Sequence, residues 1–250
     1  MSIEWAKLLF AIMLPAFATA SAQVPQPATA SEPKVEAKAP VAASSKLLDW
    51  PELGRYRAAN ETLSPDPTRV VFYGDSITDA WTRNGGTFFP GKPYVNRGIS
   101  GQTTAQMLVR FRQDVINLHP ATVVILAGTN DIAGNTGPST PEMIEDNFRS
   151  MTELAKANGI RVILASVLPA ADYPWKKGME PATKIAALNK WLAAYCVEQH
   201  LTYLDYYTPM ADAAGGMKPG LSLDGVHPNA AGYAIMEPLA QAALDQAPSK

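Results

Sequence analysis

Apolar and polar residues alternate along the chain in a pattern that predicts strands separated by helices. Short apolar runs bounded by turn residues are typical of buried parallel strands. Four runs fit this pattern, at residues 70–73, 122–127, 160–167 and 201–204, and residues 94–96 form a shorter candidate. Each run is followed by polar and glycine-containing loops, so we expect five strands in one sheet.

The segments between these runs carry apolar residues at helical spacing. Helices are expected over residues 103–118, 141–158, 181–200 and 228–244. Thr140 is a suitable cap before Pro141, and Gly159 is a typical helix stop. Strands that alternate with helices favour an α/β fold with a parallel sheet covered on both faces. In such sheets ligands bind beyond the carboxyl ends of the strands.

The first part of the chain has a different composition from the rest. Residues 1–22 have a short apolar stretch followed by Ala20-Ser21-Ala22, which is typical of a secretory signal peptide. Residues 23–45 are rich in Ala, Pro, Ser and Lys and contain almost no large apolar side chains, so we interpret them as a flexible linker. Residues 46–250 then form one domain, which we expect to be secreted or periplasmic.

Composition and charge narrow the classes of function. The chain is 47% hydrophobic and 18% charged, with a formal net charge of −2. No basic stripe is present, which argues against nucleic-acid binding. The chain has no His-Glu-x-x-His motif and only one cysteine, Cys196, so we expect no metal, no cofactor and a buried unpaired thiol. After signal cleavage we expect no stable membrane insertion; the oligomeric state stays open.

Three residues in two distant segments have the chemistry of a serine hydrolase. Ser76 follows the first strand at a strand-to-helix junction. A serine hydroxyl needs a base to become nucleophilic, and histidine suits that role near neutral pH. His227 lies before the last predicted helix, and Asp224, three residues earlier, can orient its ring through Nδ1. Taken singly, Ser76 could be a helix cap and His227 a loop residue.

Two further strand ends offer hydrogen-bond donors for an oxyanion. The backbone N–H of Ser76 is one candidate, because helix N-termini have unpaired N–H groups. Gly98, after the second strand, could present a bare backbone N–H, and Asn130, after the third, could direct its side-chain N–H groups into the cleft.

These segments together resemble the SGNH hydrolase superfamily, the GDSL-type esterases and lipases. The four matching blocks occur in order at strand ends: Gly74-Asp75-Ser76, Arg97-Gly98-Ile99-Ser100-Gly101, Gly128-Thr129-Asn130-Asp131 and Asp224-Gly225-Val226-His227. The resemblance implies a flavodoxin-like three-layer αβα sandwich. It also implies catalysis by Ser76, Asp224 and His227, with an oxyanion hole of Ser76, Gly98 and Asn130. Asp131 is expected to brace its loop.

The substrate is less well defined by the sequence. Asp75, Trp81, Tyr173 and Trp175 are expected to border the substrate, and aromatic faces with polar neighbours suit sugars. No long apolar loop is present to hold a fatty acyl tail. We therefore expect a short-chain esterase that removes O-acetyl groups from a small-molecule or polysaccharide ester. The alternatives are a lysophospholipase or thioesterase, and a non-catalytic carbohydrate-binding protein on a hydrolase scaffold.

Overall fold

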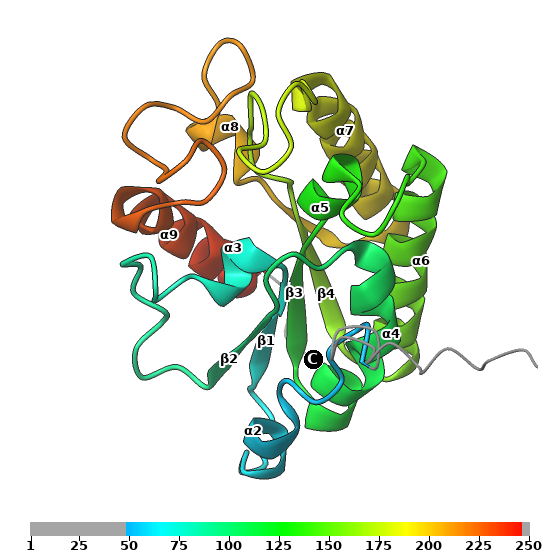
Figure 1. The fold of residues 1–250 in the computed structure, drawn as a ribbon. Helices are drawn as coiled ribbons and strands as arrows, with labels where there is room; N and C mark the ends of the chain where they lie inside the picture. The colour runs from blue at the N-terminus through cyan, green and yellow to red at the C-terminus, as the bar shows by residue number, and fades with distance from the viewer. Residues whose placement is uncertain (1–48, 247–250) are drawn as a thin grey trace, which may run out of the picture. The chain divides into compact units, whose positions relative to one another are not determined.

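The computed structural model describes residues 49–246, which are built around a parallel five-stranded sheet (Figure 1). The strand order is β2-β1-β3-β4-β5, the flavodoxin-like order. The strands are β1 (Val70–Gly74), β2 (Tyr94–Gly98), β3 (Thr122–Leu126), β4 (Arg161–Ala165) and β5 (Thr202–Leu204). The signal peptide and the linker predicted from the sequence lie outside the described residues.

Helices and one 3-10 turn connect the strands. They are α2 (Arg57–Glu61), α3 (Ser76–Asp79), α4 (Thr104–Asp114), η1 (Ile116–Leu118), α5 (Thr129–Ala133), α6 (Pro141–Ala157), α7 (Ala182–Gln199), α8 (Tyr207–Met210) and α9 (Ala230–Gln246). Within residues 49–246 no helix combines the length and the apolar character that a membrane span requires.

The fold class and the parallel sheet agree with the sequence prediction, and each of the four predicted helices has a counterpart in α4, α6, α7 and α9. One difference is the helix expected over residues 103–118, which ends at Asp114 and is followed by the separate 3-10 turn. Val115 has φ −128° and ψ −67°, so the helical hydrogen-bond series stops there. The short helices α2, α5 and α8 were not predicted, because four or five residues are too few to establish helical periodicity.

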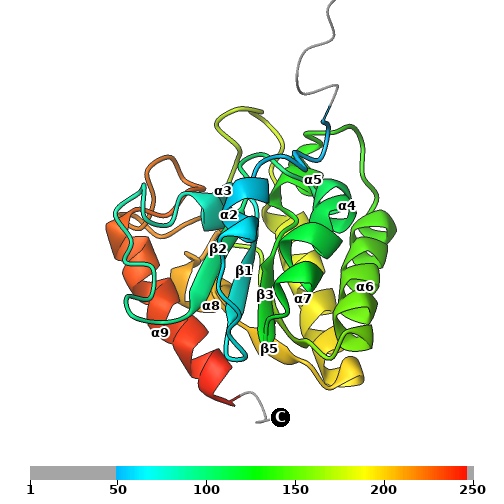
Figure 2. The ribbon, with the colours of Figure 1, turned by 90° about the horizontal axis from the view of Figure 1, so that it is seen from below.

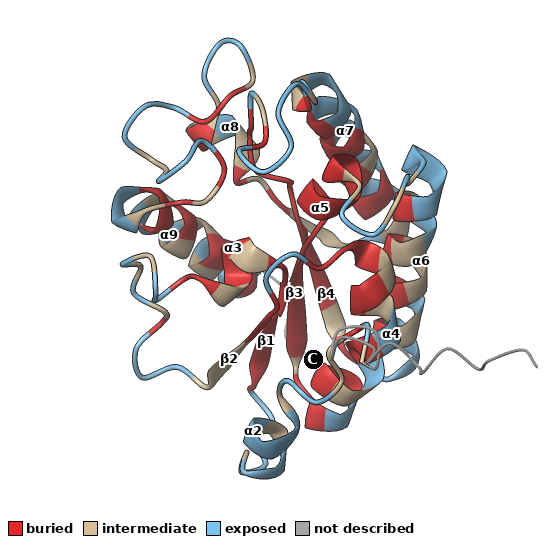
Figure 3. Ribbon diagram, in the orientation of Figure 1, coloured by how far each residue is buried: buried red, intermediate tan, exposed pale blue. Residues whose placement is uncertain are grey.

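Each face of the sheet is covered by its own group of helices (Figure 2). Alternate strand residues point to opposite faces, so Val71, Tyr73 and Ile125 pack against α4, α6 and α7, whereas Phe72 and Val124 pack against α3 and α9. The strands β1 and β3 are buried along their whole length and β4 almost so, whereas the edge strands β2 and β5 are partly half-buried. Exposed residues gather on the outer helix faces and the loops (Figure 3). The result is three layers, with helices on both sides of the sheet.

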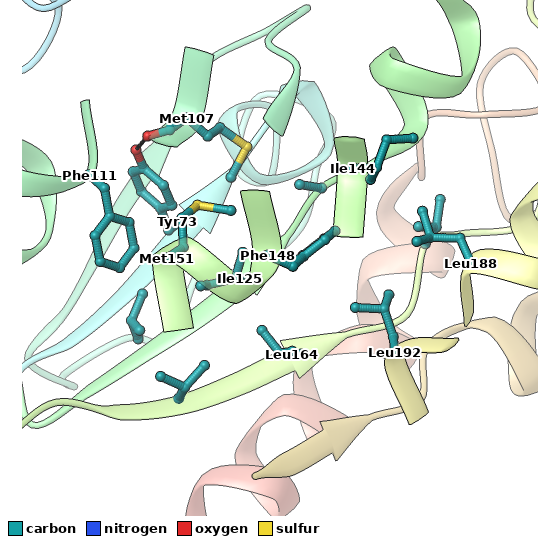
Figure 4. Close-up of a cluster of buried hydrophobic side chains, with 14 of the residues drawn as sticks. Tyr73, Met107, Phe111, Ile125, Ile144, Phe148, Met151, Leu164, Leu188 and Leu192 are labelled. Carbon is teal, nitrogen blue, oxygen red and sulfur yellow. Dashed lines mark hydrogen bonds between the residues drawn. The ribbon is translucent and has the colours of Figure 1, made fainter. Parts of the chain in front are cut away.

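The core on the α4, α6 and α7 side is close-packed around aromatic and methionine side chains (Figure 4). Phe111 lies edge-to-face against Tyr73, with ring centroids 5.4 Å apart. The Tyr73 hydroxyl donates to the Met107 carbonyl, so its polar atom has a partner inside the core. These contacts fix α4 against β1, the strand that leads into Ser76.

A fully buried arginine ties the strand ends together. Arg110, on α4, donates to the carbonyls of Gly74 and Arg97, each at 2.9 Å, and to Gln102 Oε1. Its guanidinium lies 4.2 Å from the Tyr73 ring centroid and forms an ion pair of 3.2 Å with Asp114. Both side chains of the pair have zero exposure. One side chain therefore connects the ends of β1 and β2 and the loop that follows β2.

Candidate active site

A cleft of about 440 Å³ opens at the carboxyl ends of the strands. The strand order reverses between β1 and β3, and a crevice forms at such a switch point because the connections from the two strands run to opposite faces. Ser76 follows β1 and Asn130 follows β3, and both line this cleft together with Asp224 and His227.

The turn into Ser76 depends on the two residues before it. A Cβ on Gly74 would come within 2.2 Å of Thr78 Oγ1 and 2.7 Å of the Leu126 carbonyl, so only glycine fits at the end of β1. Asp75 is the cap of α3, and its Oδ1 accepts from the Ile77 N–H at 2.9 Å. Ser76 is thereby held as the first residue of α3.

The structure brings together the three residues predicted to act as a nucleophile, base and acid. Ser76 Oγ lies 2.9 Å from His227 Nε2, and His227 Nδ1 lies 2.8 Å from Asp224 Oδ2. Asp224 Oδ1 also accepts from the backbone N–H groups of Val226 and His227, at 3.0 and 2.8 Å. Gly225 has φ +88°, which permits the tight turn between the acid and the histidine.

These contacts set the charge of Asp224. Partial burial raises the pKa of its carboxyl, but hydrogen bonds from the His227 backbone and ring and from the Val226 backbone outweigh burial and lower the pKa below its usual value. Asp224 is therefore an anion at neutral pH. It can keep the proton of His227 on Nδ1 and leave Nε2 free to accept from Ser76.

Asp75, beside Ser76, has the opposite property. Its side chain is buried, and burial raises the pKa of its carboxyl to about 6. The folded protein then keeps the Asp75 proton up to about pH 6, whereas the unfolded chain releases it near pH 3.9. Folding stability falls as the pH rises through this window, by roughly 2–3 kcal/mol.

We therefore expect Asp75→Asn to become more stable relative to the wild type as the pH rises from 4 to 7. The neutral amide has no proton to lose, so the variant avoids the cost of ionising a buried carboxyl. Urea unfolding of both proteins at the two pH values measures the difference in free energy of unfolding. A difference that does not change with pH would contradict the raised pKa.

The predicted Gly98 donor is not available to a substrate. The Gly98 N–H donates to Asn96 Oδ1 at 2.9 Å, and its carbonyl accepts from the Tyr56 hydroxyl. A Cβ on Gly98 would come within 2.2 Å of the Asp79 backbone nitrogen, so this glycine allows β2 to contact α3. The prediction of Gly98 in the oxyanion hole was therefore wrong.

Gly101, three residues later, presents the free N–H that Gly98 lacks. Gly101 lines the cleft beside Ser76, and its φ of +82° favours glycine. Among the described residues, neither the Gly101 N–H nor the Ser76 N–H has a hydrogen-bond acceptor. Sequence reasoning missed Gly101, although the same motif block contains it.

Asn130 lies where the sequence predicted it, with its amide at the cleft. Its Nδ2 donates to the Gln102 carbonyl at 2.9 Å and makes a longer contact of 3.4 Å with Asp75 Oδ2. The helix that carries it is braced by Asp131, whose carboxylate accepts from the backbone N–H and hydroxyl of Thr104. Ser76, Gly101 and Asn130 therefore line one cleft and bring to it two backbone N–H groups that have no acceptor among the described residues, and one side-chain amide.

The predicted substrate-binding aromatics fall into two groups. Trp81 and Tyr173 are buried, with exposures of 1% and 0%, so they belong to the core and do not border the cleft. Asp75, also predicted to border the substrate, is buried as well, and its side chain caps the N-terminus of α3. Trp175 does line the cleft, with 43% of its surface exposed, and its ring centroid lies 5.8 Å from that of His227.

Other residues of the cleft wall were not singled out from the sequence. Leu223 is 63% exposed on the histidine side, and Arg83 lies on the α3 side. Neither residue could be identified from the sequence, because a loop sequence does not show which of its side chains faces a cleft.

Cys196 is buried, as predicted, and burial raises the pKa of its thiol to about 12.

The sheet order and the contacts from Ser76 through His227 to Asp224 define a serine hydrolase of the SGNH type. A family model for GDSL-like lipase/acylhydrolase proteins matches residues 72–235. The chain belongs to this family of ester hydrolases.

Individual relatives agree with this assignment. The crystal structure of a GDSL-like lipase from Bacteroides thetaiotaomicron superposes with a TM-score of 0.77. The two sequences are 46% identical, and the match covers 80% of this chain and 100% of that chain. A protein from Bacteroides fragilis is 47% identical, with a TM-score of 0.76 over 79% and 97%. Esterase TesA of Pseudomonas aeruginosa is 28% identical over 54% of this chain and 60% of its own length. The chain thus matches less than two thirds of that esterase.

Proposed function

We propose that this protein is an exported serine esterase that removes short acyl groups, chiefly acetyl groups, from carbohydrate esters. The observation that carries the proposal is the pair of contacts from Ser76 Oγ to His227 Nε2 and from His227 Nδ1 to Asp224, at 2.9 and 2.8 Å, in an open cleft. Export rests on the signal-like composition of residues 1–22, and a secreted or periplasmic enzyme would meet polysaccharides.

The proposed reaction passes through an acyl-enzyme. Ser76 Oγ attacks the ester carbonyl while His227 Nε2 takes its proton, and Asp224 stabilises the imidazolium that forms. The tetrahedral intermediate collapses, the alcohol leaves with the proton from His227, and the acyl group stays on Ser76. Water, deprotonated by His227, then attacks the acyl-enzyme. The bond from the acyl carbon to Ser76 Oγ breaks, His227 returns its proton to Ser76 Oγ, and the carboxylic acid is released.

Negative charge develops on the former carbonyl oxygen during both attacks. The N–H groups of Ser76 and Gly101 and the Asn130 amide are the donors we assign to this oxyanion. One such donor contributes about 2.7–4 kcal/mol to transition-state stabilisation. The 3.4 Å contact between Asn130 Nδ2 and Asp75 is the weaker of its two contacts, so it is the one that a substrate oxygen can replace at low cost.

The cleft wall supports a short acyl group and a polar alcohol. Most of the side chains that line it are polar: Arg83, Asn84, Ser100, Asn130 and Asn135. The large apolar ones are Trp175 and Leu223, which lie at the exposed rim. An exposed indole among hydrogen-bonding groups suits the face of a sugar ring, whereas a long acyl chain needs a continuous apolar channel.

The substrate assignment is tested by hydrolysis of nitrophenyl esters from acetate to palmitate, and by release of acetate from acetylated xylan. We expect the rate to be highest for acetate and to fall with chain length, and we expect xylan to be deacetylated. A maximum at long chains would replace the carbohydrate proposal with the lysophospholipase or thioesterase alternative. Sugar binding without hydrolysis of any ester would favour a non-catalytic carbohydrate-binding protein.

A further inference from the structure

One exposed asparagine connects two of the assigned oxyanion donors. Asn135 follows α5 and lines the cleft. Its Nδ2 donates to Asn130 Oδ1 at 2.8 Å and to the Gly101 carbonyl at 3.2 Å. Its backbone N–H donates to the Asn130 carbonyl at 3.0 Å, which places the two side chains in contact.

The other end of the Asn135 amide is held by a tryptophan. Trp175 Nε1 donates to Asn135 Oδ1 at 3.2 Å. The indole ring stacks on buried Tyr173, with centroids 5.0 Å apart and 21° between the ring planes. An N–H donor can pair only with the oxygen of the amide, so Trp175 fixes Oδ1 on its own side and directs Nδ2 towards Asn130 and Gly101.

We propose that Asn135 is a positioning residue for the oxyanion hole, and this inference rests on the proposed esterase function. Asn135 donates to Oδ1 of Asn130, while the Gln102 carbonyl accepts from Nδ2 of the same residue. The two contacts select one of the two orientations of the Asn130 amide. The bond to the Gly101 carbonyl restrains the glycine that lines the cleft and whose N–H is assigned to the oxyanion hole. Donors fixed before the reaction need no reorganisation in the transition state.

The proposal distinguishes two substitutions of Asn135. Asn135→Ala removes the donor to Asn130 Oδ1, so the Asn130 amide keeps only its contact with the Gln102 carbonyl and is held less firmly in its orientation. Asn135→Asp puts carboxylate oxygens beside Asn130 Oδ1, while the Gln102 carbonyl still faces Nδ2. Either orientation of Asn130 then leaves two oxygens in contact, so this substitution displaces the amide as well as freeing it.

The closing experiment measures kcat and KM for nitrophenyl acetate. We expect kcat to fall about 10-fold in Asn135→Ala and about 100-fold in Asn135→Asp, since losing one oxyanion donor outright costs about 10²–10³. KM should change less than about 2-fold, because the hydrogen bonds from the donors to the substrate oxygen strengthen only in the transition state. Trp175→Phe keeps an aromatic ring but loses the indole Nε1 donor to Asn135, so its kcat should fall by a smaller factor than in the Asn135 variants. The matched control is Asn158→Ala, because Asn158 is an exposed asparagine at the end of α6. This variant should keep the wild-type kcat and KM.

Two results would overturn the positioning role. One is unchanged kcat in both Asn135 variants, and the other is a rise in KM alone, which would make Asn135 a ground-state substrate contact. The NMR signals of the Asn130 side-chain amide give a second readout, independent of turnover. They should shift in both Asn135 variants and not in Asn158→Ala, and unshifted signals would refute the inference. An inactive wild type with shifted amide signals would instead refute the esterase proposal alone.

Discussion

Ser76→Ala is expected to keep the fold and to lose about 10⁴-fold or more in kcat on every ester that the wild type hydrolyses. The substitution removes one oxygen, whose hydrogen-bond partner is His227 Nε2 at 2.9 Å. No acyl-enzyme can then form. Any remaining rate would come from direct attack of water on the ester, with the oxyanion stabilised by the backbone donors and the Asn130 amide. The measurement is kcat for nitrophenyl acetate, together with thermal unfolding to confirm that the fold persists.

Two comparisons make the Ser76 result specific. Ser222→Ala is a useful control, because Ser222 lies on the histidine loop and its hydroxyl accepts only from the Gly225 N–H among the described residues. We expect that control to lose little activity. Covalent labelling by a fluorophosphonate should occur in the wild type and be absent from Ser76→Ala. Equal turnover in Ser76→Ala and wild type would show that another nucleophile is used.

Arg110→Met is expected to have the largest effect on stability, lowering the free energy of unfolding by about 3–5 kcal/mol. Methionine fills a similar volume but donates no hydrogen bond. It leaves the Asp114 carboxylate buried without its cation and the Gly74 and Arg97 carbonyls without the guanidinium. Removing one partner of a buried ion pair costs more than the pair contributes, because the remaining charge is not solvated.

Chemical denaturation of three further proteins tests that explanation. Arg112→Met, on the exposed face of the same helix, should change the free energy of unfolding by less than about 0.5 kcal/mol. Asp114→Asn alone and the double variant Arg110→Met with Asp114→Asn complete a cycle. The double variant should recover part of the loss, since neither charge of the buried pair remains. A loss in Arg112→Met as large as that in Arg110→Met would point to helix propensity instead of the buried pair.

The main elements of the fold could be predicted because the strands and long helices have strong hydrophobic patterns. Three motif blocks at the ends of β1, β2 and β3 and a fourth in the loop before α9 were enough to bring Ser76, Asn130, Asp224 and His227 to one edge of the sheet. Parallel strands place their carboxyl ends together whatever the intervening sequence. The contacts of Ser76, His227 and Asp224 then follow from the turn at Gly225.

The donor assignment could not be predicted from the motif alone. The second block contains Gly98 and Gly101, and both could present a bare N–H. The choice depends on Asn96, whose side-chain Oδ1 accepts from the Gly98 N–H, whereas the Gly101 N–H has no acceptor among residues 49–246. Such a local side-chain contact follows from the packing of β2 against α3, which the sequence pattern does not contain.

The predictions that Trp81 and Tyr173 border the substrate failed for a related reason. Trp81, Tyr173 and Trp175 all occur in segments that were expected to be loops, and a loop position does not determine burial. Trp81 packs among Phe72, Phe88 and Tyr233, with ring centroids between 4.9 and 5.8 Å. Tyr173 becomes the buried platform on which Trp175 rests. Only the third of these residues remains available to a substrate.

The buried state of Cys196 makes the protein convenient for labelling. It is the only cysteine in the sequence, and a thiol whose pKa is raised to about 12 forms almost no thiolate at neutral pH. A maleimide should therefore leave it untouched in the folded protein. Replacing Leu223, at the exposed rim of the cleft, with a cysteine would provide a single reactive position. A fluorophore attached there could report the arrival and departure of ester substrates in real time, and a response to acetylated polysaccharide would be expected from the proposed function.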